Sequence, residues 1–209
     1  MVPELSANGL TCIKRDRVLF ENLSFSLHAG ELVYLRGPNG AGKTSLLRIL
    51  TGLSMPSSGC VQFRGETIAS SEDFAASVIY IGHKSALNGA FTAIENLYFW
   101  SAQQGLAPTQ GELFNCLDRL GLVGLEEIPV KFLSAGQQRR VALSRLWLKQ
   151  APLWVLDEPF TALDTQGVAL LEAAFASHTN DGGAVLTTSH QALSPLAGTI
   201  RHYDLEYRI

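Results

Sequence analysis

The sequence predicts an α/β protein with a mainly parallel, doubly wound sheet and an inserted helical lobe. Three largely apolar runs, at residues 32–35, 153–156 and 184–187, have the composition of strands that are buried on both faces. The stretch from about residue 85 to 132 lacks this strand pattern and holds helical segments instead. Because strands that alternate with helices favour a parallel sheet, we expect these strands to form the central layer of the core.

The expected elements follow from the local pattern, in chain order. Before the lobe, we expect strands at residues 10–13, 18–20, 23–27, 32–35, 60–65 and 78–81, and a helix over residues 45–50. Within the lobe, we expect helices around residues 94–100 and 113–120. The whole chain, residues 1–209, is expected to form one domain, with a core of about 1–84 and 136–209 and a lobe of about 85–135.

The composition, 46% hydrophobic and 17% charged, is typical of a globular protein, and 209 residues are enough for one good core. A net charge of −3 argues against a nucleic-acid binder, which usually presents a basic face. No run of 18 apolar residues is present, and the N-terminus lacks the features of a signal peptide. Cys12, Cys60 and Cys116 are scattered and odd in number, so we expect buried thiols in a reducing, cytoplasmic compartment.

One segment fits G-x-x-x-x-G-K-[ST], the phosphate-binding loop of nucleotide triphosphatases. Its residues are Gly37, Pro38, Asn39, Gly40, Ala41, Gly42, Lys43 and Thr44, with Ser45 next to them. The glycines allow backbone N–H groups to converge on phosphate oxygens. Lys43 is expected to reach the β- and γ-phosphates, and the Thr44 hydroxyl to hold Mg²⁺. A chance glycine-rich turn is the alternative, and the strand before the loop and the helix after it argue against it.

Two adjacent carboxylates, Asp157 and Glu158, directly follow the apolar run at residues 153–156. The carboxyl end of a strand is where ligands bind in open α/β sheets. We expect Asp157 to help hold Mg²⁺, and Glu158 to act as the general base that polarises the attacking water. A solvated acidic turn would look similar in isolation, but the phosphate-binding loop favours the catalytic interpretation.

A helix start is predicted at Ser134, because Gln137 follows it at the spacing of a capping box. The free N–H groups and the positive dipole end of such a helix suit a phosphate. Taken alone, the pattern predicts no more than a helix cap.

The order of these motifs resembles that of ATP-binding cassette (ABC) ATPases. Residues 133–137 are similar to the signature motif, with Ala135 in place of its first glycine. Residues 161–164 look like the D-loop, and His190 looks like the switch histidine. The resemblance extends from about Leu5 to His202 and implies a P-loop NTPase core with an N-terminal antiparallel β subdomain and the inserted lobe.

In this family two cassettes dimerise head to tail, with ATP between the phosphate-binding loop of one and the signature of the other. The resemblance therefore implies a homodimer, or a pair with a second cassette. It implies nucleotide contacts from Ser134, Gly136, Gln137 and Asp164, those of Ser134 and the Gly136 backbone being to the γ-phosphate in trans. It also implies that His190 contacts the γ-phosphate and Glu158, so that Lys43, Glu158 and His190 are the catalytic residues. A lone surface histidine is the alternative for His190.

Two positions depart from the family pattern. His83 stands where the family usually has glutamine, and imidazole prefers softer metals than Mg²⁺. We therefore expect His83 to sense the γ-phosphate by a hydrogen bond, with pH-sensitive coupling as a consequence. The aromatic residue that normally stacks on adenine is missing, and the guanidinium of Arg15 is a candidate replacement.

A narrower resemblance is carried by residues 80–83, 92–99, 133–148 and 155–163, which are similar to the ATP-binding subunits of bacterial cytochrome c maturation systems. It implies ATP and Mg²⁺ as cofactors, integral membrane subunits as partners, and a peripheral location on the cytoplasmic face of the inner membrane. Hydrolysis would then serve haem handling or the release of a haem-loaded chaperone. Direct haem binding is not expected, because Cys-x-x-Cys-His spacing is absent.

Two alternatives remain open: the ATPase subunit of another ABC transporter, and a soluble mechanical ABC ATPase. The second class usually has paired cassettes, coiled-coil insertions or basic arms, which this sequence lacks. An apolar cluster in the lobe is a candidate docking surface for a membrane subunit, and its members are Leu87, Phe91, Leu97, Phe99 and Trp100. The competing interpretation is that they form the core of the lobe. Phe91 and Trp100 are the preferred docking candidates.

Overall fold

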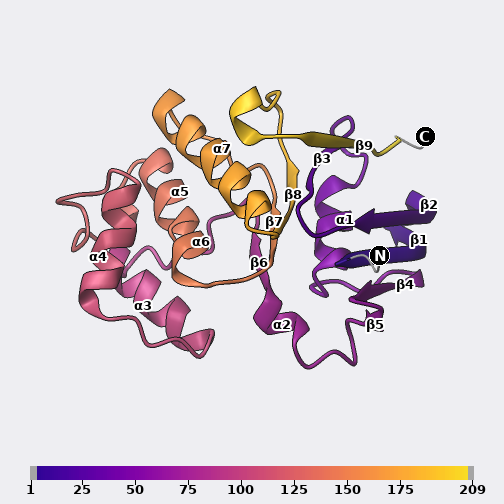
Figure 1. Ribbon diagram of the computed structural model, residues 1–209, viewed down its shortest axis with the longest axis horizontal. Helices are drawn as coiled ribbons and strands as arrows, with labels where there is room; N and C mark the ends of the chain where they lie inside the picture. The colour runs from indigo at the N-terminus through magenta and orange to yellow at the C-terminus, as the bar shows by residue number, and fades with distance from the viewer. Residues whose placement is uncertain (1–3, 207–209) are drawn as a thin grey trace.

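Two sheets and a helical lobe make up the chain in a computed structural model, which describes residues 4–206 (Figure 1). A five-stranded sheet, with strand order β6-β7-β8-β3-β9, forms the centre. Every pairing in this sheet is parallel, as predicted. The strands are β3 (Leu32–Arg36), β6 (Val78–Ile81), β7 (Leu153–Leu156), β8 (Ala184–Thr188) and β9 (Ile200–Asp204).

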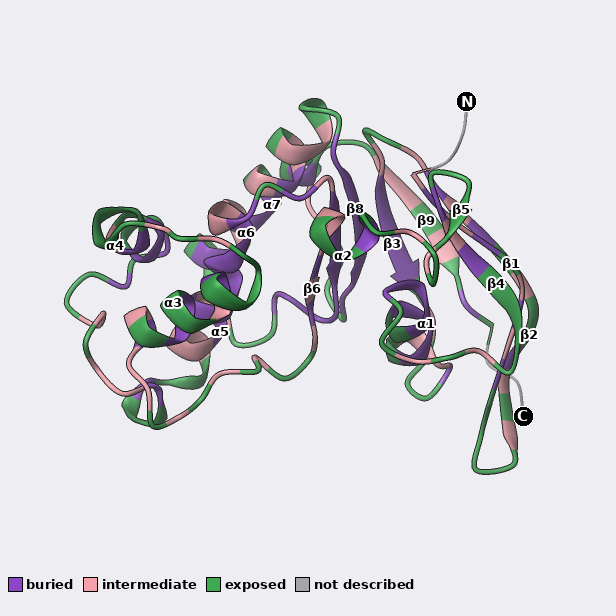
Figure 2. Cartoon of the chain, turned by 90° about the horizontal axis from the view of Figure 1, so that it is seen from below, coloured by how far each residue is buried: buried purple, intermediate pink, exposed green. Residues whose placement is uncertain are grey.

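The central sheet divides the apolar core into two parts. In β7, the side chains of Leu153 and Val155 belong to one part, and those of Trp154 and Leu156 to the other. This alternation is the period of a strand that is buried on both faces. Helix α1 (Lys43–Leu50) covers one face, and α7 (Thr165–Asn180) lies on the other (Figure 2).

An antiparallel sheet packs on the far side of α1 (Figure 2). Its strand order is β2-β1-β4-β5, and its members are β1 (Leu5–Lys14), β2 (Arg17–Leu27), β4 (Ser58–Phe63) and β5 (Glu66–Thr67). The three short strands expected at the N-terminus are therefore two long ones, joined by a hairpin. This hairpin carries Lys14 and Arg15 toward the site described below.

The helical lobe contains α3 (Ala93–Gln103), α4 (Gln110–Arg119) and the 3₁₀ helix η1 (Val130–Phe132). Both α helices begin with a capping box, made by Thr92 with Glu95 and by Thr109 with Glu112. The lobe then returns to the core through α5 (Ala135–Leu143) and α6 (Arg145–Leu148). A short helix, α2 (Phe74–Ser77), precedes β6.

Two expectations need correction. Cys12 and Cys116 are buried free thiols, but Cys60 is exposed, because it lies in the first half of β4, whose residues face solvent. In the lobe cluster, Leu97 is fully buried and belongs to the core rather than to a docking surface. Among residues 4–206, no helix is both long and apolar enough to cross a membrane.

Candidate active site

A pocket of about 700 Å³ opens where β3, β6, β7 and β8 end, at the carboxyl edge of the central sheet. This is the edge at which ligands bind in open α/β sheets. Its lining residues are Lys14, Arg15, Leu19, Asn39, Gly40, Gly42, Lys43, Thr44, Ser45, His83, Asp157, Glu158 and His190. The sheet topology thus brings together the predicted phosphate-binding loop, both carboxylates and both histidines.

The phosphate-binding loop has the backbone shape that its glycines allow. Gly40 and Gly42 have positive φ angles of 83° and 101°, which most other residues adopt at a cost. Gly42 is the N-cap residue of α1 and leaves the first N–H groups of the helix without a side-chain cap. Such a helix end is a ready anion site.

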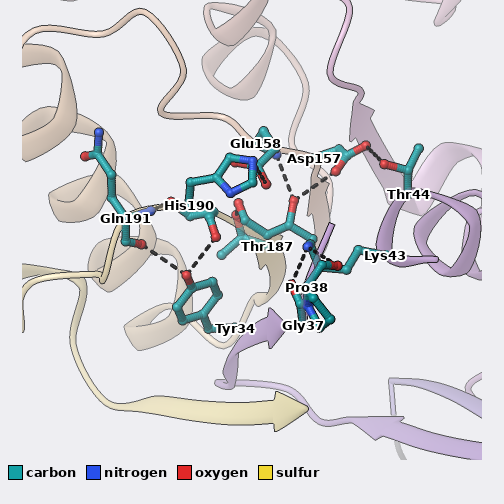
Figure 3. A network of polar contacts seen from close by, with 12 residues as sticks. Tyr34, Gly37, Pro38, Lys43, Thr44, Asp157, Glu158, Thr187, His190 and Gln191 are labelled. Atoms are coloured by element: carbon teal, nitrogen blue, oxygen red, sulfur yellow. Dashed lines mark hydrogen bonds and ion pairs between the residues drawn. The ribbon is translucent and has the colours of Figure 1, made fainter. Parts of the chain in front are cut away.

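The Lys43 ammonium group lies over this loop (Figure 3). Its Nζ donates hydrogen bonds of 2.6 Å to the Gly37 carbonyl and 3.2 Å to the Pro38 carbonyl. Ala41, in the same loop, is buried. Together, the ammonium group and the open N–H groups create a cradle with the charge and shape for a polyphosphate.

Asp157 is held from two sides. The Thr44 hydroxyl donates a hydrogen bond of 2.7 Å to Asp157 Oδ2, and the Thr188 hydroxyl donates one of 2.9 Å to Oδ1. The carboxylate is buried, with an exposed fraction of 1%. Thr44 and Asp157 present hard oxygen donors next to the phosphate cradle, and oxygen is the ligand that Mg²⁺ prefers. The residues present therefore fit Mg²⁺.

Glu158 adopts a positive φ angle of 52°, which is uncommon for a residue with a side chain. Its backbone N–H donates a hydrogen bond of 2.9 Å to the Thr188 hydroxyl oxygen, and this bond stabilises the turn. Its Oε1 lies 3.5 Å from Nε2 of His190 (Figure 3). Backbone geometry of this kind is unfavourable and persists only where the surrounding structure holds it in place. It clusters at functional sites.

Arg139 joins the α5 helix to this turn, although sequence reasoning gave it no role. Its buried guanidinium group donates to the carbonyls of Gly82, Asp157, Glu158 and Pro159 at 2.8–3.2 Å. Burial lowers the pKa of Arg139 to about 10, so the group is still charged at neutral pH. A rigid fork of donors is suited to several carbonyls at once, and it fixes the backbone beneath Glu158 and next to His83.

The signature segment lies outside the pocket of its own chain, whose lining includes none of Ser134, Gly136, Gln137 and Asp164. The predicted capping box is confirmed, since Ser134 Oγ accepts from the Gln137 N–H at 3.2 Å and Gln137 Oε1 accepts from the Ser134 N–H at 2.8 Å. Asp164 caps α7 through the Gly167 N–H, and its Oδ1 also accepts from Arg140 at 2.5 Å. One chain therefore does not bring the two halves of the predicted site together.

The hairpin end of the pocket is lined by Lys14, Arg15 and Leu19. Arg15 has a positive φ angle of 48°, in the turn between β1 and β2. The location agrees with a role at the base end of a nucleotide, but stacking by Arg15 stays a prediction. Sequence reasoning missed Leu19 because it reads only as one more apolar strand residue.

Known proteins resemble this chain over nearly its whole length. Residues 20–161 match the family model described as ABC transporter. The protein named cytochrome c biogenesis ATP-binding export protein CcmA from Idiomarina loihiensis is 50% identical over 208 residues, which are 99% of this chain and 94% of that protein. Its namesake from Salmonella typhi is 49% identical over 202 residues, 96% of each chain.

Solved structures share the fold at lower sequence identity. The ATP-binding subunit of an ABC transporter superposes with a TM-score of 0.85 at 23% identity, covering 98% of this chain and 88% of that one. A dimeric cassette in a post-hydrolysis state, bound to ADP and Pi, superposes with a TM-score of 0.81 at 22% identity, covering 98% of this chain and 97% of that one.

Proposed function

Because this chain belongs to the ABC transporter family, we propose that it is the ATP-hydrolysing subunit of a membrane complex in c-type cytochrome biogenesis. One observation carries the catalytic part of the proposal. The side chains of Glu158 and His190 lie in contact with each other in the pocket that the phosphate-binding loop lines. The same pocket holds the hydrogen-bonded oxygens of Thr44 and Asp157. The cytochrome part rests on the printed names of relatives about half identical to this chain.

In the proposed reaction, the triphosphate of ATP lies on residues 37–45, where Lys43 exchanges its loop carbonyls for the β- and γ-phosphates. Thr44 and Asp157 would hold Mg²⁺, which supplies positive charge to the phosphate oxygens when bound. Water attacks the γ-phosphorus, the bond to the β,γ-bridging oxygen breaks, and Glu158 accepts the proton of that water. His190 orients Glu158 and contacts the γ-phosphate, while His83 senses the same phosphate from the end of β6.

A second cassette completes the site in this proposal. Ser134, Gly136, Gln137 and Asp164 lie outside the pocket of their own chain, as residues that act on a partner's nucleotide would. The N-terminus of α5, capped by Ser134, would then face the γ-phosphate of the partner. In a symmetric homodimer that forms on ATP binding, each chain supplies these residues to the nucleotide of the other, so both sites are completed together.

The proposed complex lies on the cytoplasmic face of the bacterial inner membrane, with integral membrane subunits as partners and haem handling, or the release of a haem-loaded chaperone, as the coupled process. Phe91 is the favoured docking residue on this chain. Its ring centroid lies 4.9 Å from that of Phe99, a residue that is 46% exposed. Trp100 is the second candidate, but its ring also covers the Arg145 guanidinium at 5.6 Å. Retention of Phe91→Ala and Trp100→Ala chains on membranes, with normal folding, would contradict the docking role.

The test is a mild-detergent pull-down of tagged Glu158→Gln chain from native membranes with ATP and Mg²⁺. This change keeps the size of the side chain but removes the base, so ATP should bind, hydrolysis should fall at least a hundredfold, and dimers should accumulate (about 10²–10⁴ is typical for a general base). Lys43→Ala is the matched control, because it should fail to retain ATP and should not dimerise.

Co-purification of small membrane subunits with haem supports the proposal. Recovery of an unrelated permease would point to another ABC transporter, and recovery of ribosomes or DNA to a mechanical ATPase. Either result would overturn the cytochrome role and leave the ATPase chemistry intact.

A further inference from the structure

The segment that carries His190 runs across the surface between β8 and the 3₁₀ helix η2 (Pro195–Ala197). The His190 side chain is 63% exposed, so little packing surrounds its ring. A group that must meet Glu158 at a defined distance needs support, and at this position the support has to come through the backbone.

Tyr34 provides that support from β3. Its hydroxyl lies 2.8 Å from the Ser189 carbonyl and 3.1 Å from the Gln191 carbonyl, the two residues that flank His190 (Figure 3). Tyr34 is buried in the sheet next to β8, where it is in register with Thr187. One hydroxyl from a rigid strand therefore holds the chain on both sides of the histidine.

The hydroxyl can act here only as a donor, because both of its partners are carbonyl oxygens. Burial raises the pKa of Tyr34, and the negative charge of Glu158 raises it further. The proton therefore stays on the hydroxyl at neutral pH, and the two carbonyls share it.

The far end of the segment is also fixed. Glu172, buried on α7, accepts a hydrogen bond of 2.7 Å from the Ser194 N–H and another from the Ser194 hydroxyl. Within the segment, Ser189 Oγ accepts from the Gln191 N–H at 2.9 Å. The far end of the segment is thus attached to α7, and Tyr34 attaches the part around His190 to β3.

We propose that Tyr34 is a positioning residue for ATP hydrolysis, whose hydroxyl holds the backbone on both sides of His190 and so keeps the imidazole against Glu158. This inference rests on the role proposed above for His190. Tyr34 itself touches no reacting atom. Its loss should therefore reduce the turnover rate without weakening the binding of ATP.

The test compares Tyr34→Phe with Tyr203→Phe. Tyr203, on the adjacent strand β9, also donates from its hydroxyl to a backbone carbonyl, that of Ser24 at 2.8 Å, and it does not line the pocket. Each change removes one hydroxyl and keeps the ring. We expect Tyr34→Phe to lower kcat about tenfold with KM for ATP changed less than about twofold, and Tyr203→Phe to leave both unchanged.

Two further measurements separate positioning from general stability. In a His190→Ala chain, the additional Tyr34→Phe change should lower the residual rate by less than about twofold, because the group that it positions is gone. In the proton–carbon NMR spectrum, the imidazole signal that disappears in His190→Ala should shift or broaden in Tyr34→Phe and stay in place in Tyr203→Phe.

A Tyr34→Phe chain with the kcat of Tyr203→Phe would overturn the inference, and so would an equal loss in the presence and absence of His190. The two proposals fail in different ways. If His190→Ala is inactive while Tyr34→Phe is fully active, only the Tyr34 inference fails. If His190→Ala keeps full activity, the proposed role of His190 fails, and the role of Tyr34 fails with it.

Discussion

The hydroxyl of Thr188, at the end of β8, donates a hydrogen bond of 2.9 Å to Oδ1 of Asp157, which follows β7. The Thr188 hydroxyl oxygen also accepts a hydrogen bond of 2.9 Å from the backbone N–H of Glu158. Thr188 is fully buried. One side chain therefore fixes the carboxylate proposed to hold Mg²⁺ and the backbone of the proposed general base.

Replacing Thr188 by valine should separate this role from packing. Valine has nearly the same shape, but it leaves a buried carboxylate oxygen and a buried N–H without their partner. We expect the free energy of unfolding to fall by about 1–3 kcal/mol, and the Mg²⁺ concentration for half-maximal ATP hydrolysis to rise several-fold. Urea unfolding and a Mg²⁺ titration of activity measure the two effects.

Thr187→Val is the matched control. Thr187 is equally buried, but its hydroxyl donates only a long bond of 3.3 Å to the Thr188 carbonyl. It should lose less stability, and its Mg²⁺ dependence should not change. Equal Mg²⁺ titrations for the two variants would show that the Thr188 hydroxyl does not orient Asp157.

Gly136 gives a second prediction, because the backbone at Ala162 passes directly over it. A Cβ built on Gly136 would clash with the carbonyl oxygen of Ala162, a residue that itself has a positive φ angle of 63°. Since a backbone atom cannot rotate away as a side chain can, Gly136→Ala should push the backbone at Ala162 away from α5. We expect a loss of about 1–3 kcal/mol in stability and a lower rate of ATP hydrolysis.

The control for this change is Gly111→Ala in α4, where a new Cβ would meet no atom within 4 Å outside the adjoining backbone of its own helix. Alanine favours the helix at such a position, so the variant should gain stability by about 0.4–1 kcal/mol and keep its activity. Thermal unfolding of both variants tests the opposite signs. If Gly136→Ala were as stable as Gly111→Ala, the backbone at Ala162 would be able to move away from the new Cβ at little cost, and the prediction would be wrong.

The parts of the site that could be predicted from sequence are those defined by short spacing. The phosphate-binding loop, the Asp157–Glu158 pair and the cap at Ser134 each occupy a few consecutive residues, and each pattern has a local physical reason. The convergence of the phosphate-binding loop and the carboxylate pair on one pocket followed from the rule that ligands bind at the carboxyl ends of parallel strands, whereas the cap at Ser134 lies outside that pocket.

The supporting residues could not be found in this way. Thr188 lies 31 residues from Asp157, and Arg139 lies 57 residues from Gly82, so only the folded sheet and α5 bring them together. Strand β9 was missed for a different reason. It is polar and only partly buried, so it lacks the apolar run that identified β7 and β8.

His178 gives the last prediction, which concerns pH. Its ring stacks on Trp154 with 3.8 Å between ring centroids, and its Nε2 lies 3.2 Å from the Pro152 carbonyl. Burial lowers the pKa of His178 from its ordinary 6.5, although the Pro152 carbonyl and Asp181 oppose that shift. The unfolded chain therefore binds a proton at this residue at a pH where the folded chain does not.

The sign of the effect follows from that difference. The stability that a neutral His178 contributes is fully present above about pH 6.5 and is lost as the pH falls through its lowered folded pKa. His178→Phe keeps an aromatic ring on Trp154 but cannot titrate, so its free energy of unfolding should fall less than that of the wild type between about pH 6.5 and 5. Urea unfolding across this range is the measurement, with the exposed His202→Gln as the control. If His202→Gln flattened the pH dependence as much as His178→Phe did, the proton uptake would not belong to the half-buried His178 ring.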